Sequence, residues 1–362
     1  KRYVAIAEKR AKVNLIFNSA RTAAALDAKK LSLAAMIENK AGGEAARRKS
    51  FAPIRENLQA ALKARKNETA AQFTLRRSLL ALELGEAERF IAESKLLALG
   101  FRFDPKTQQA TLDLDLSAIA DTSLDKSIGN LSKTRSHFAS VPRPPSTILS
   151  FRIHHPLDTF RRNSLQTVLL ATRDAIQGDI TKTASATDDQ KAASTKVLDT
   201  IVSIVQDSLQ KGVLDAFVEV TPVMGGNNVM VAAIRTVQGQ RLRAALEAVP
   251  NSTLGADVQL DTAKEGDVSI HTLTVPAKFN ADYAIIFGNS QTILIGTSPD
   301  AVWCAAGPQA LASLKAAITA RAKPGKPGPD PVFVDLSIAA GPWLRAYDIR
   351  MGTEGEVADR KL

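Results

Sequence analysis

The clearest structural signal in the chain reads VSIHTLTV (268–275), AIIFGNS (284–290), TILIGTS (292–298) and PDAVWCAAGPQALASLKAAITARA (299–322). The first segment alternates apolar and polar residues, which is typical of a half-buried strand. The next two segments are short and apolar, and a turn at 289–291 divides them. The last segment is rich in Ala, which favours a helix. We therefore expect a β-meander followed by an amphipathic helix.

Similar patterns recur earlier in the chain. Alternating segments on either side of turn residues predict hairpins at 98–119, 215–237 and 257–275. Helical periodicity marks 69–95 and 195–212. These patterns predict an α+β fold of two tandem related units, each an antiparallel sheet covered by helices, with a basic and mostly helical N-terminal arm.

The predicted organisation has five parts. They are a basic N-terminal arm (1–68), a first α+β unit (69–177), a mobile loop (178–194), a second α+β unit (195–322) and a Pro/Gly linker with a C-terminal strand and tail (323–362). The loop prediction rests on the polar composition of GDITKTASATDDQKAAS (178–194).

The order of elements suggests an internal repeat. Helix 69–95, hairpin 98–119 and helix 124–141 have counterparts in helix 195–212, hairpin 215–237 and helix 239–249. A hairpin–helix unit exposes one apolar sheet face, so packed tandem copies are favoured. The N-terminal arm could be a third, eroded copy. The other interpretation is chance, because every α+β chain alternates helices and hairpins.

Basic residues are concentrated near the N-terminus. Residues 1–100 contain 20 Lys and Arg against 10 Asp and Glu, whereas the rest of the chain contains equal numbers. Such asymmetry indicates either a solvated helical surface or a surface for a polyanion or an acidic partner. The candidate contact residues are Arg47, Arg48, Lys49, Lys63, Arg65, Lys66, Arg76 and Arg77.

Three phrases carry a resemblance to a known group of proteins. They are LALGFRFDPKTQQATLDLDLSAI, KTRSHFASVPRP and ILIGTSPDAV followed by GPQALASLKAAI. With these phrases, residues 85–320 resemble a loose group of secreted bacterial envelope proteins of planctomycete type that contain repeated α+β units. The phrases are structural and contain no site residues. The resemblance therefore implies a periplasmic or envelope location, and it implies no activity.

His154, His155 and Asp158 form the only cluster with metal-ligand chemistry, since imidazole and carboxylate groups bind zinc. Neighbouring residues on a strand point to opposite faces, so both histidines reach one ion only if the strand has already ended. The alternative is a pair of histidines at a strand end, with Asp158 capping the next helix.

Recognisable catalytic motifs are absent from the sequence. It contains no GxSxG, HExxH, GxxxxGK[ST] or CxxC pattern, and no GxGxxG after a strand. The single cysteine, Cys304, lies in an apolar segment without a neighbouring activating group, which predicts a buried structural thiol. We therefore expect a protein that is not an enzyme and that needs no cofactor.

The leading hypothesis is a structural, binding or assembly protein of a bacterial envelope that acts through protein–protein contacts or self-assembly. The alternative is polyanion or nucleic-acid binding through residues 1–100. A third hypothesis is a zinc-dependent hydrolase around His154 and His155. No apolar run in the sequence is long enough to predict a transmembrane segment. The sequence does not distinguish a lipid-like ligand from ordinary packing.

Overall fold

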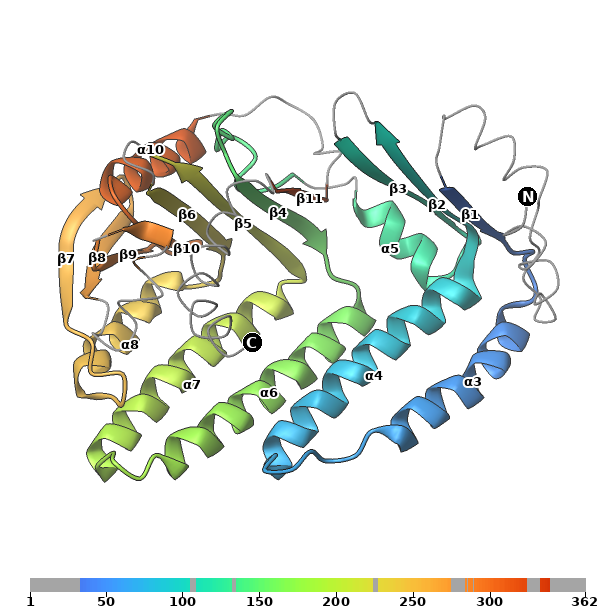
Figure 1. The fold of residues 1–362 in the computed structure, drawn as a ribbon, viewed down its shortest axis with the longest axis horizontal. Coiled ribbons are helices and arrows are strands. Elements are labelled where there is room, and N and C mark those ends of the chain that lie inside the picture. The colour runs from blue at the N-terminus through green and yellow to red at the C-terminus, as the bar shows by residue number, and fades with distance from the viewer. Residues whose placement is uncertain are drawn as a thin grey trace, which may run out of the picture. The chain divides into compact units, whose positions relative to one another are not determined.

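The computed structural model of the chain describes residues 33–104, 109–131, 135–223, 227–274, 284, 286–288, 290–323 and 333–338. The chain divides into two compact units, Lys1–Asn130 and Leu131–Leu362. Each unit contains one antiparallel sheet, with three strands in the first and eight in the second (Figure 1). The predicted α+β fold with antiparallel sheets is therefore confirmed.

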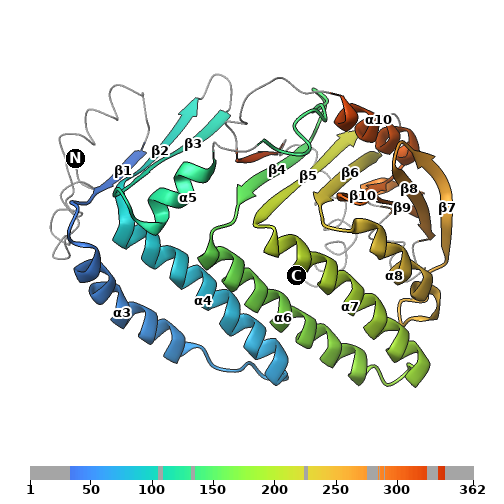
Figure 2. The ribbon, with the colours of Figure 1, turned by 180° about the vertical axis from the view of Figure 1, so that it is seen from behind.

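The first unit combines a small sheet with a pair of long helices. Its elements are β1 (Leu33–Glu38), α3 (Glu44–Ala61), α4 (Ala70–Glu93), β2 (Ser94–Asp104), β3 (Gln109–Ala118) and α5 (Ser123–Leu131). The strand order is β1-β2-β3, and α3 packs against α4 (Figure 2). A capping box starts α4, because Thr69 Oγ1 accepts a hydrogen bond from Gln72 N and Gln72 Oε1 accepts one from Thr69 N, both at 3.1 Å.

Buried charged side chains join the elements of the first unit. The guanidinium of Arg47 donates from Nε and Nη2 to the carbonyl of Ala92 at 2.9 and 2.7 Å, so it satisfies the C-terminal end of α4. Glu93 Oε2 accepts hydrogen bonds from Leu124 N and Ser123 Oγ, both at 2.7 Å. Glu93 thereby holds the start of α5 against the end of α4.

The second unit is a larger sheet with helices. Its elements are β4 (Leu149–Pro156), α6 (Thr159–Lys182), α7 (Asp188–Gln210), β5 (Val213–Pro222), β6 (Asn228–Arg235), η1 (Gly239–Arg241), α8 (Leu242–Ala248), η2 (Val249–Asn251), β7 (Val258–Glu265), β8 (Val268–Thr274), β9 (Thr292–Thr297), β10 (Ala301–Ala306), α10 (Ala310–Ala322) and β11 (Val334–Ile338). The strand order is β11-β4-β5-β6-β10-β9-β8-β7. Every neighbouring pair is antiparallel. The two edges of this sheet are therefore β11 and β7.

The core of the second unit lies where α10 packs against the sheet. Trp303 of β10 is completely buried. Its ring packs edge to face against the rings of Phe138 and Phe217, with distances between ring centroids of 5.4 and 6.0 Å. Leu314 and Ile318 of α10 join the same cluster of buried side chains. The mainly aliphatic core between the sheet and α10 thus contains a small aromatic centre.

The prediction for 299–322 is wrong in its first part. Residues Ala301–Ala306 form β10, which pairs with β6 on one side and β9 on the other. Ala favours a helix, but this preference is small in free energy. The burial of Trp303 and its alternate neighbours in a central strand outweighs it. Conversely, the described residues of 284–287 are helical rather than extended.

The boundary between the units also differs from the prediction. β4 pairs with β5 along its whole length, so β4 and α6 belong to the second unit rather than to a first unit of 69–177. The segment 178–194 is not a long loop, because α6 continues to Lys182 and α7 begins at Asp188. Thr187 and Gln190 form a capping box at the start of α7. The first turn of this helix is polar, so its composition resembles that of a loop.

Two further expectations need correction. The predicted arm 1–68 is not a separate part, because β1 pairs with β2 and α3 packs against α4, while residues 1–32 lie outside the described residues. The helix predicted at 124–141 ends at Leu131 as α5, and residues 137–140 form turns. The C-terminal strand is present as β11, and the tail after it lies outside the described residues.

The two units share an order of elements. A strand, two long helices, two strands and a shorter helix follow one another in β1-α3-α4-β2-β3-α5 and in β4-α6-α7-β5-β6-α8. The strand orders β1-β2-β3 and β4-β5-β6 also correspond. Both second helices begin with a Thr-x-x-Gln capping box. Origin of the two units by duplication remains a prediction, because the second sheet has further strands that the first does not share.

Candidate interaction site at the β11 edge

β11 is an edge strand with unusually exposed apolar side chains. It pairs with β4 from Val334↔Ile153 to Ile338↔Leu149. Val334, Leu336 and Ile338 lie on one face of the strand, and they are 43%, 59% and 55% exposed. We call these three side chains the β11 apolar row.

The local sequence explains the strand. PVFVDLSI (331–338) is rich in β-branched residues and alternates, and it follows a Pro/Gly-rich segment in which a helix is disfavoured. At an edge, however, only one side of the strand is paired. The N–H and C=O groups that point away from β4 are therefore potential partners for another strand.

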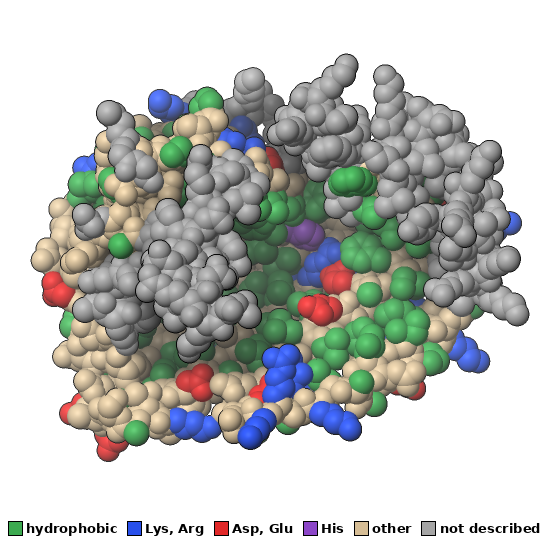
Figure 3. Space-filling view, in the orientation of Figure 1, with side chains coloured by type: hydrophobic (Ala, Val, Ile, Leu, Met, Phe, Trp, Pro, Cys, Tyr) green, Lys and Arg blue, Asp and Glu red, His purple; other side chains and the backbone are tan. Residues whose placement is uncertain are grey.

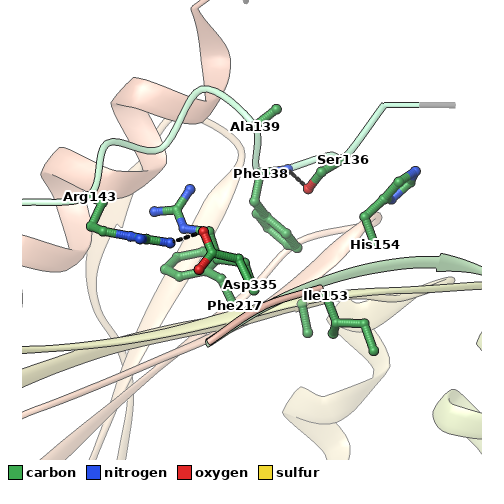
Figure 4. Close-up of a pocket in the computed structure, with 10 residues that line it drawn as sticks. Ser136, Phe138, Ala139, Arg143, Ile153, His154, Phe217 and Asp335 are labelled. Carbon is green, nitrogen blue, oxygen red and sulfur yellow. Dashed lines mark hydrogen bonds and ion pairs between the residues drawn. The ribbon is translucent and has the colours of Figure 1, made fainter. Parts of the chain in front are cut away.

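The opposite face of β11 borders a cavity of about 380 Å³ (Figure 4). Asp335 of β11 forms an ion pair with Arg143. Arg143 belongs to residues 135–148, which cross this face of the sheet before β4 and are called the crossing segment below. Ser136, Phe138 and His154 also line the cavity. The ion pair is partly exposed, so it positions β11 more than it stabilises the fold.

A buried polar cluster fixes the crossing segment to the sheet. Asp215 of β5 is completely buried and accepts hydrogen bonds from Ser136 Oγ at 2.8 Å and from His137 N at 2.6 Å. His154 of β4 places Nδ1 at 3.2 Å from Asp215 Oδ2. Asp215 thus accepts hydrogen bonds from two neighbouring residues of the crossing segment, as a buried carboxylate normally does.

The cluster contains the three residue types of a hydrolase triad, but their order differs. A nucleophilic serine needs its hydroxyl to donate to the imidazole, which then removes the proton. Here the hydroxyl of Ser136 donates to the carboxylate of Asp215. In this arrangement the hydroxyl of Ser136 is a donor to Asp215, so it links the crossing segment to β5.

The histidine pair does not form a shared site with Asp158. His154 faces Asp215, whereas His155 lies beside Arg161, whose Nη1 is 3.3 Å from His155 Nε2. Asp158 caps α6 by accepting a hydrogen bond from Arg161 N at 2.9 Å. Among the described residues, no group of three His, Cys, Asp or Glu side chains converges as metal ligands. The zinc-hydrolase hypothesis therefore lacks its predicted constellation, and the capping role of Asp158 is confirmed.

The predicted polyanion residues fall into two groups. Arg47 is buried and bonded to backbone carbonyls, Arg48 pairs with Glu88 and Glu93, and Arg76 pairs with Glu68. The hydrogen bonds from Arg76 lower the pKa of Glu68 to about 2, so this pair stays charged across the neutral range. Arg47 is removed from the candidate surface, since its side chain does not reach solvent.

The other members of the set are exposed: Lys49, Lys63, Arg65, Lys66 and Arg77. Three of these, Lys63, Arg65 and Lys66, lie in the connection between α3 and α4 (residues 62–69). On the face viewed in Figure 3, hydrophobic side chains cover much of α4, and Lys and Arg side chains lie mostly at the margins. On this face, the basic side chains therefore do not form a continuous row along α4.

Cys304 lies in β10 and is mostly buried. Burial raises the pKa of the Cys304 thiol to about 11, because the thiolate would lose hydration without gaining a positive partner. The thiol is therefore protonated at neutral pH, as expected for a structural residue rather than a nucleophile.

The β7 edge is built differently from the β11 edge. Its ladder with β8 contains a bulge between Gln259 and Ala263, and Asp261 within it has a left-handed φ of 51°. Asp261 pairs with Arg243 of α8, and Glu265 accepts a hydrogen bond from Thr319 Oγ1 of α10 at 2.8 Å. Bulges, charges and covering helices are the devices by which proteins block an edge strand.

Sequence reasoning missed the residues that organise this site. Asp215, Phe217 and Glu219 alternate in DAFVEV, so two carboxylates lie on the buried face of a strand. An acidic residue at a core position of an apolar strand is a signal that sequence alone offers. Its partners were not visible, because Ser136 and Arg152 are 79 and 67 residues away from the carboxylates that they contact.

Comparison with known proteins gives no further guide. No protein-family model, no curated protein and no solved structure matches the chain. The resemblance to secreted envelope proteins therefore remains a prediction. Across the described residues, none of the helices combines the length and the apolar character needed to cross a membrane.

Proposed function

We propose that the chain is a non-catalytic binding and assembly protein, and that two copies associate by pairing their β11 strands. The observation that carries this proposal is the exposed β11 apolar row on an edge strand that has no bulge in its ladder and no lysine. An edge of this kind favours the addition of another strand.

A second copy is the partner that this strand fits best. Two identical edge strands that pair antiparallel are related by a two-fold axis, so each copy offers the same residues to the other. The apolar row of one copy then continues into the apolar row of its partner on the same face of a joined sheet. Asp335 remains on the other face, where Arg143 already neutralises it.

The expected affinity is modest. Burying six half-exposed aliphatic side chains contributes on the order of 6 kcal/mol, from roughly 2 kcal/mol for full burial of each. Backbone hydrogen bonds add about 1 kcal/mol each. Lost rotational and translational freedom opposes this with at least about 4 kcal/mol. We expect a reversible dimer with a Kd in the micromolar range or weaker.

The experiment is sedimentation of the intact chain over a range of concentrations. The wild type is expected to show concentration-dependent dimers, and Leu336→Lys is expected to weaken association by about tenfold or more, since a charge replaces the centre of the apolar row. Leu311→Lys is the matched control, because Leu311 is also an exposed leucine of the second unit but lies on α10.

The outcomes are distinct. A wild type that stays monomeric at every concentration contradicts the proposal, and so does equal weakening by the two leucine substitutions. The envelope location rests on the resemblance of residues 85–320 to secreted proteins and is part of the same proposal. The lack of an activated nucleophile at Ser136 and at Cys304 supports a non-catalytic role.

A second candidate function is binding of a polyanion by the first unit. It rests on the three exposed basic residues between α3 and α4. Replacing Lys63, Arg65 and Lys66 together by Gln is expected to reduce binding of single-stranded nucleic acid and to flatten its salt dependence. Arg47→Gln is not informative, since its effect on folding would mask any effect on binding.

A further inference from the structure

The sheet face opposite α10 is apolar across five adjacent strands of the second unit. One row of cross-strand partners crosses β4, β5, β6, β10 and β9, and its members are Phe151, Val218, Ala232, Cys304 and Ile295. The two flanking rows, two residues away along each strand, are also apolar except at Thr297. We call these three rows the β4–β9 apolar face.

The two sides of the sheet differ in how well they are covered. On the α10 side, alternate residues such as Phe217, Val231 and Trp303 are buried in the core cluster. On the β4–β9 apolar face, the five residues of the central row are all half-buried, so each keeps part of its surface accessible. A continuous apolar face that is only partly covered marks an interaction surface.

The size of this face limits what can cover it. Strands lie ~4.8 Å apart and side chains on one face repeat every ~6.8 Å, so the three rows of five residues cover about 500 Å². A standard interface between two proteins buries about 800 Å² on each partner. The face is therefore small for a stable dimer of its own, and its size suits a single segment of chain.

The residues that follow β11 are within reach of this face. Leu336 pairs with Phe151, so the central row continues into β11, and the strand ends two residues later at Ile338. Residues 339–362 lie outside the described residues. The first three of them, 339–341, span up to about 10 Å, which is about two strand spacings. A ten-residue stretch then spans about 15 Å as a helix and at most about 35 Å when extended, so it reaches the centre of the face in either conformation.

The sequence after that point is suited to an apolar surface. PWLRAYDIRM (342–351) contains five large apolar residues in a chain with only 5% aromatic residues, and they are Trp343, Leu344, Tyr347, Ile349 and Met351. The sequence beyond it, GTEGEVADRKL (352–362), is mostly polar. We propose that residues 342–351 lie across the β4–β9 apolar face of their own chain and cover it. A segment on the sheet face leaves the free edge of β11 unpaired, so the proposed dimer is not required.

Cys304 is the single cysteine of the chain and lies in the central row, so its thiol reports whether the face is covered. The measurement is the rate of Cys304 alkylation by iodoacetamide in the intact chain, at one pH and at several protein concentrations. Trp343→Lys is expected to raise this rate about tenfold or more, because the segment loses its largest apolar side chain and gains a charge. Val357→Lys is the matched control from the polar end of the same segment, and it is expected to leave the rate within a factor of about two.

Trp343 gives a second readout, from the side of the segment. Trp303 is completely buried, so quenching of tryptophan fluorescence by acrylamide reports mainly on Trp343. Ala232→Glu places a charge beside Cys304 and is expected to raise the quenching constant about twofold or more. Leu311→Glu, at an exposed position of α10, is expected to leave it unchanged. Trp343→Lys does not alter the sheet, so the alkylation test holds even if Ala232→Glu fails to fold.

Three results would overturn the proposal. Equal alkylation rates in the wild type, Trp343→Lys and Val357→Lys would show that the segment does not cover Cys304. Protection of Cys304 that rises with protein concentration would assign the cover to a second copy. Acrylamide quenching of the folded wild type as strong as that of the unfolded chain would place Trp343 in solvent.

Discussion

The two edges of the eight-stranded sheet both carry unpaired backbone N–H and C=O groups, but they differ in how far other parts of the chain block these groups. At β7, a bulge, a left-handed Asp261 and contacts from α8 and α10 interrupt or cover the unpaired backbone. At β11, the ladder is regular and three aliphatic side chains are 43–59% exposed. Within the described residues, a bulge and contacts from two helices block the β7 edge, whereas the β11 ladder contains no bulge and its apolar side chains are exposed.

The difference also extends to how each edge strand is held. β7 is joined to β8 in a hairpin and is bonded to two helices. β11 pairs with β4, and Asp335 forms an ion pair with Arg143. Phe333, directly before the strand, has a ring contact with His155. The β11 edge therefore depends on the crossing segment that Asp215 fixes to β5.

The largest expected effect is that of Asp215→Asn. The amide replaces an acceptor by a donor in a cluster that already contains the donors Ser136 Oγ and His137 N. We expect the free energy of unfolding to fall by about 3 kcal/mol, as for other broken buried charge clusters. The measurement is chemical denaturation of each variant.

The matched control is Asp261→Asn at the β7 edge. Asp261 is exposed, and Asn tolerates the left-handed conformation, so we expect a change below about 1 kcal/mol. Equal losses for the two variants would mean that the Asp215 cluster does not anchor the crossing segment.

The next prediction concerns pH and the β7 edge. His271 of β8 is buried, its Nδ1 accepts a hydrogen bond from Asp261 N at 3.0 Å, and its Nε2 lies 3.0 Å from Thr297 Oγ1. Burial lowers the pKa of His271. The unfolded chain therefore binds a proton more readily than the folded one, so this contribution to stability is complete above pH ~6.5 and is lost as the pH falls below that value.

Unfolding free energies measured from pH 8 to pH 5 check this expectation. The burial of His137 lowers its pKa as well, so two histidines contribute to the same slope. His271→Asn is expected to be less stable than the wild type at neutral pH but to show a shallower loss on acidification. An unchanged slope in His271→Asn would assign the pH dependence to His137 and other groups.

The smallest expected effect on stability is that of breaking the surface ion pair at either edge strand. Each edge strand has one Arg–Asp pair, Arg143–Asp335 at β11 and Arg243–Asp261 at β7. Both pairs are partly exposed, so neither Arg143→Gln nor Arg243→Gln is expected to change the unfolding free energy by more than about 1 kcal/mol.

Hydrogen exchange is expected to distinguish Arg143→Gln from Arg243→Gln even though their unfolding free energies are similar. Arg143→Gln is expected to accelerate exchange of the β11 amides, because among the described residues β11 pairs with β4 on one side only. Arg243→Gln is expected to leave β7 nearly unchanged, since α10 and β8 still hold it. The reverse pattern would show that the two edges are held equally well.

Much of the fold could be predicted from local patterns. The hairpins at 98–119, 215–237 and 257–275 follow from alternation and turn residues, and the structure contains all three. AVWCAA (301–306) was mistaken for a helix because its Ala residues have high helix propensity. Only its position between β6 and β9, set by residues far away in sequence, makes it a strand.

The candidate site was less predictable. Its apolar row follows from VFVDLSI (332–338), but the exposure of that row depends on β11 pairing with β4, almost two hundred residues earlier. The basic residues were identified by type, yet Arg47 and Arg76 are committed to internal partners that composition does not reveal. Sequence indicates which side chains exist, and tertiary pairing decides which of them remain available.

The most direct test of the unequal edges is hydrogen exchange of the wild type at low and high protein concentration. If two copies pair through β11, the β11 amides become more protected as concentration rises, whereas the β7 amides do not change. β11 protection that is independent of concentration, or equal changes at β7 and β11, would contradict the assembly through the β11 edge.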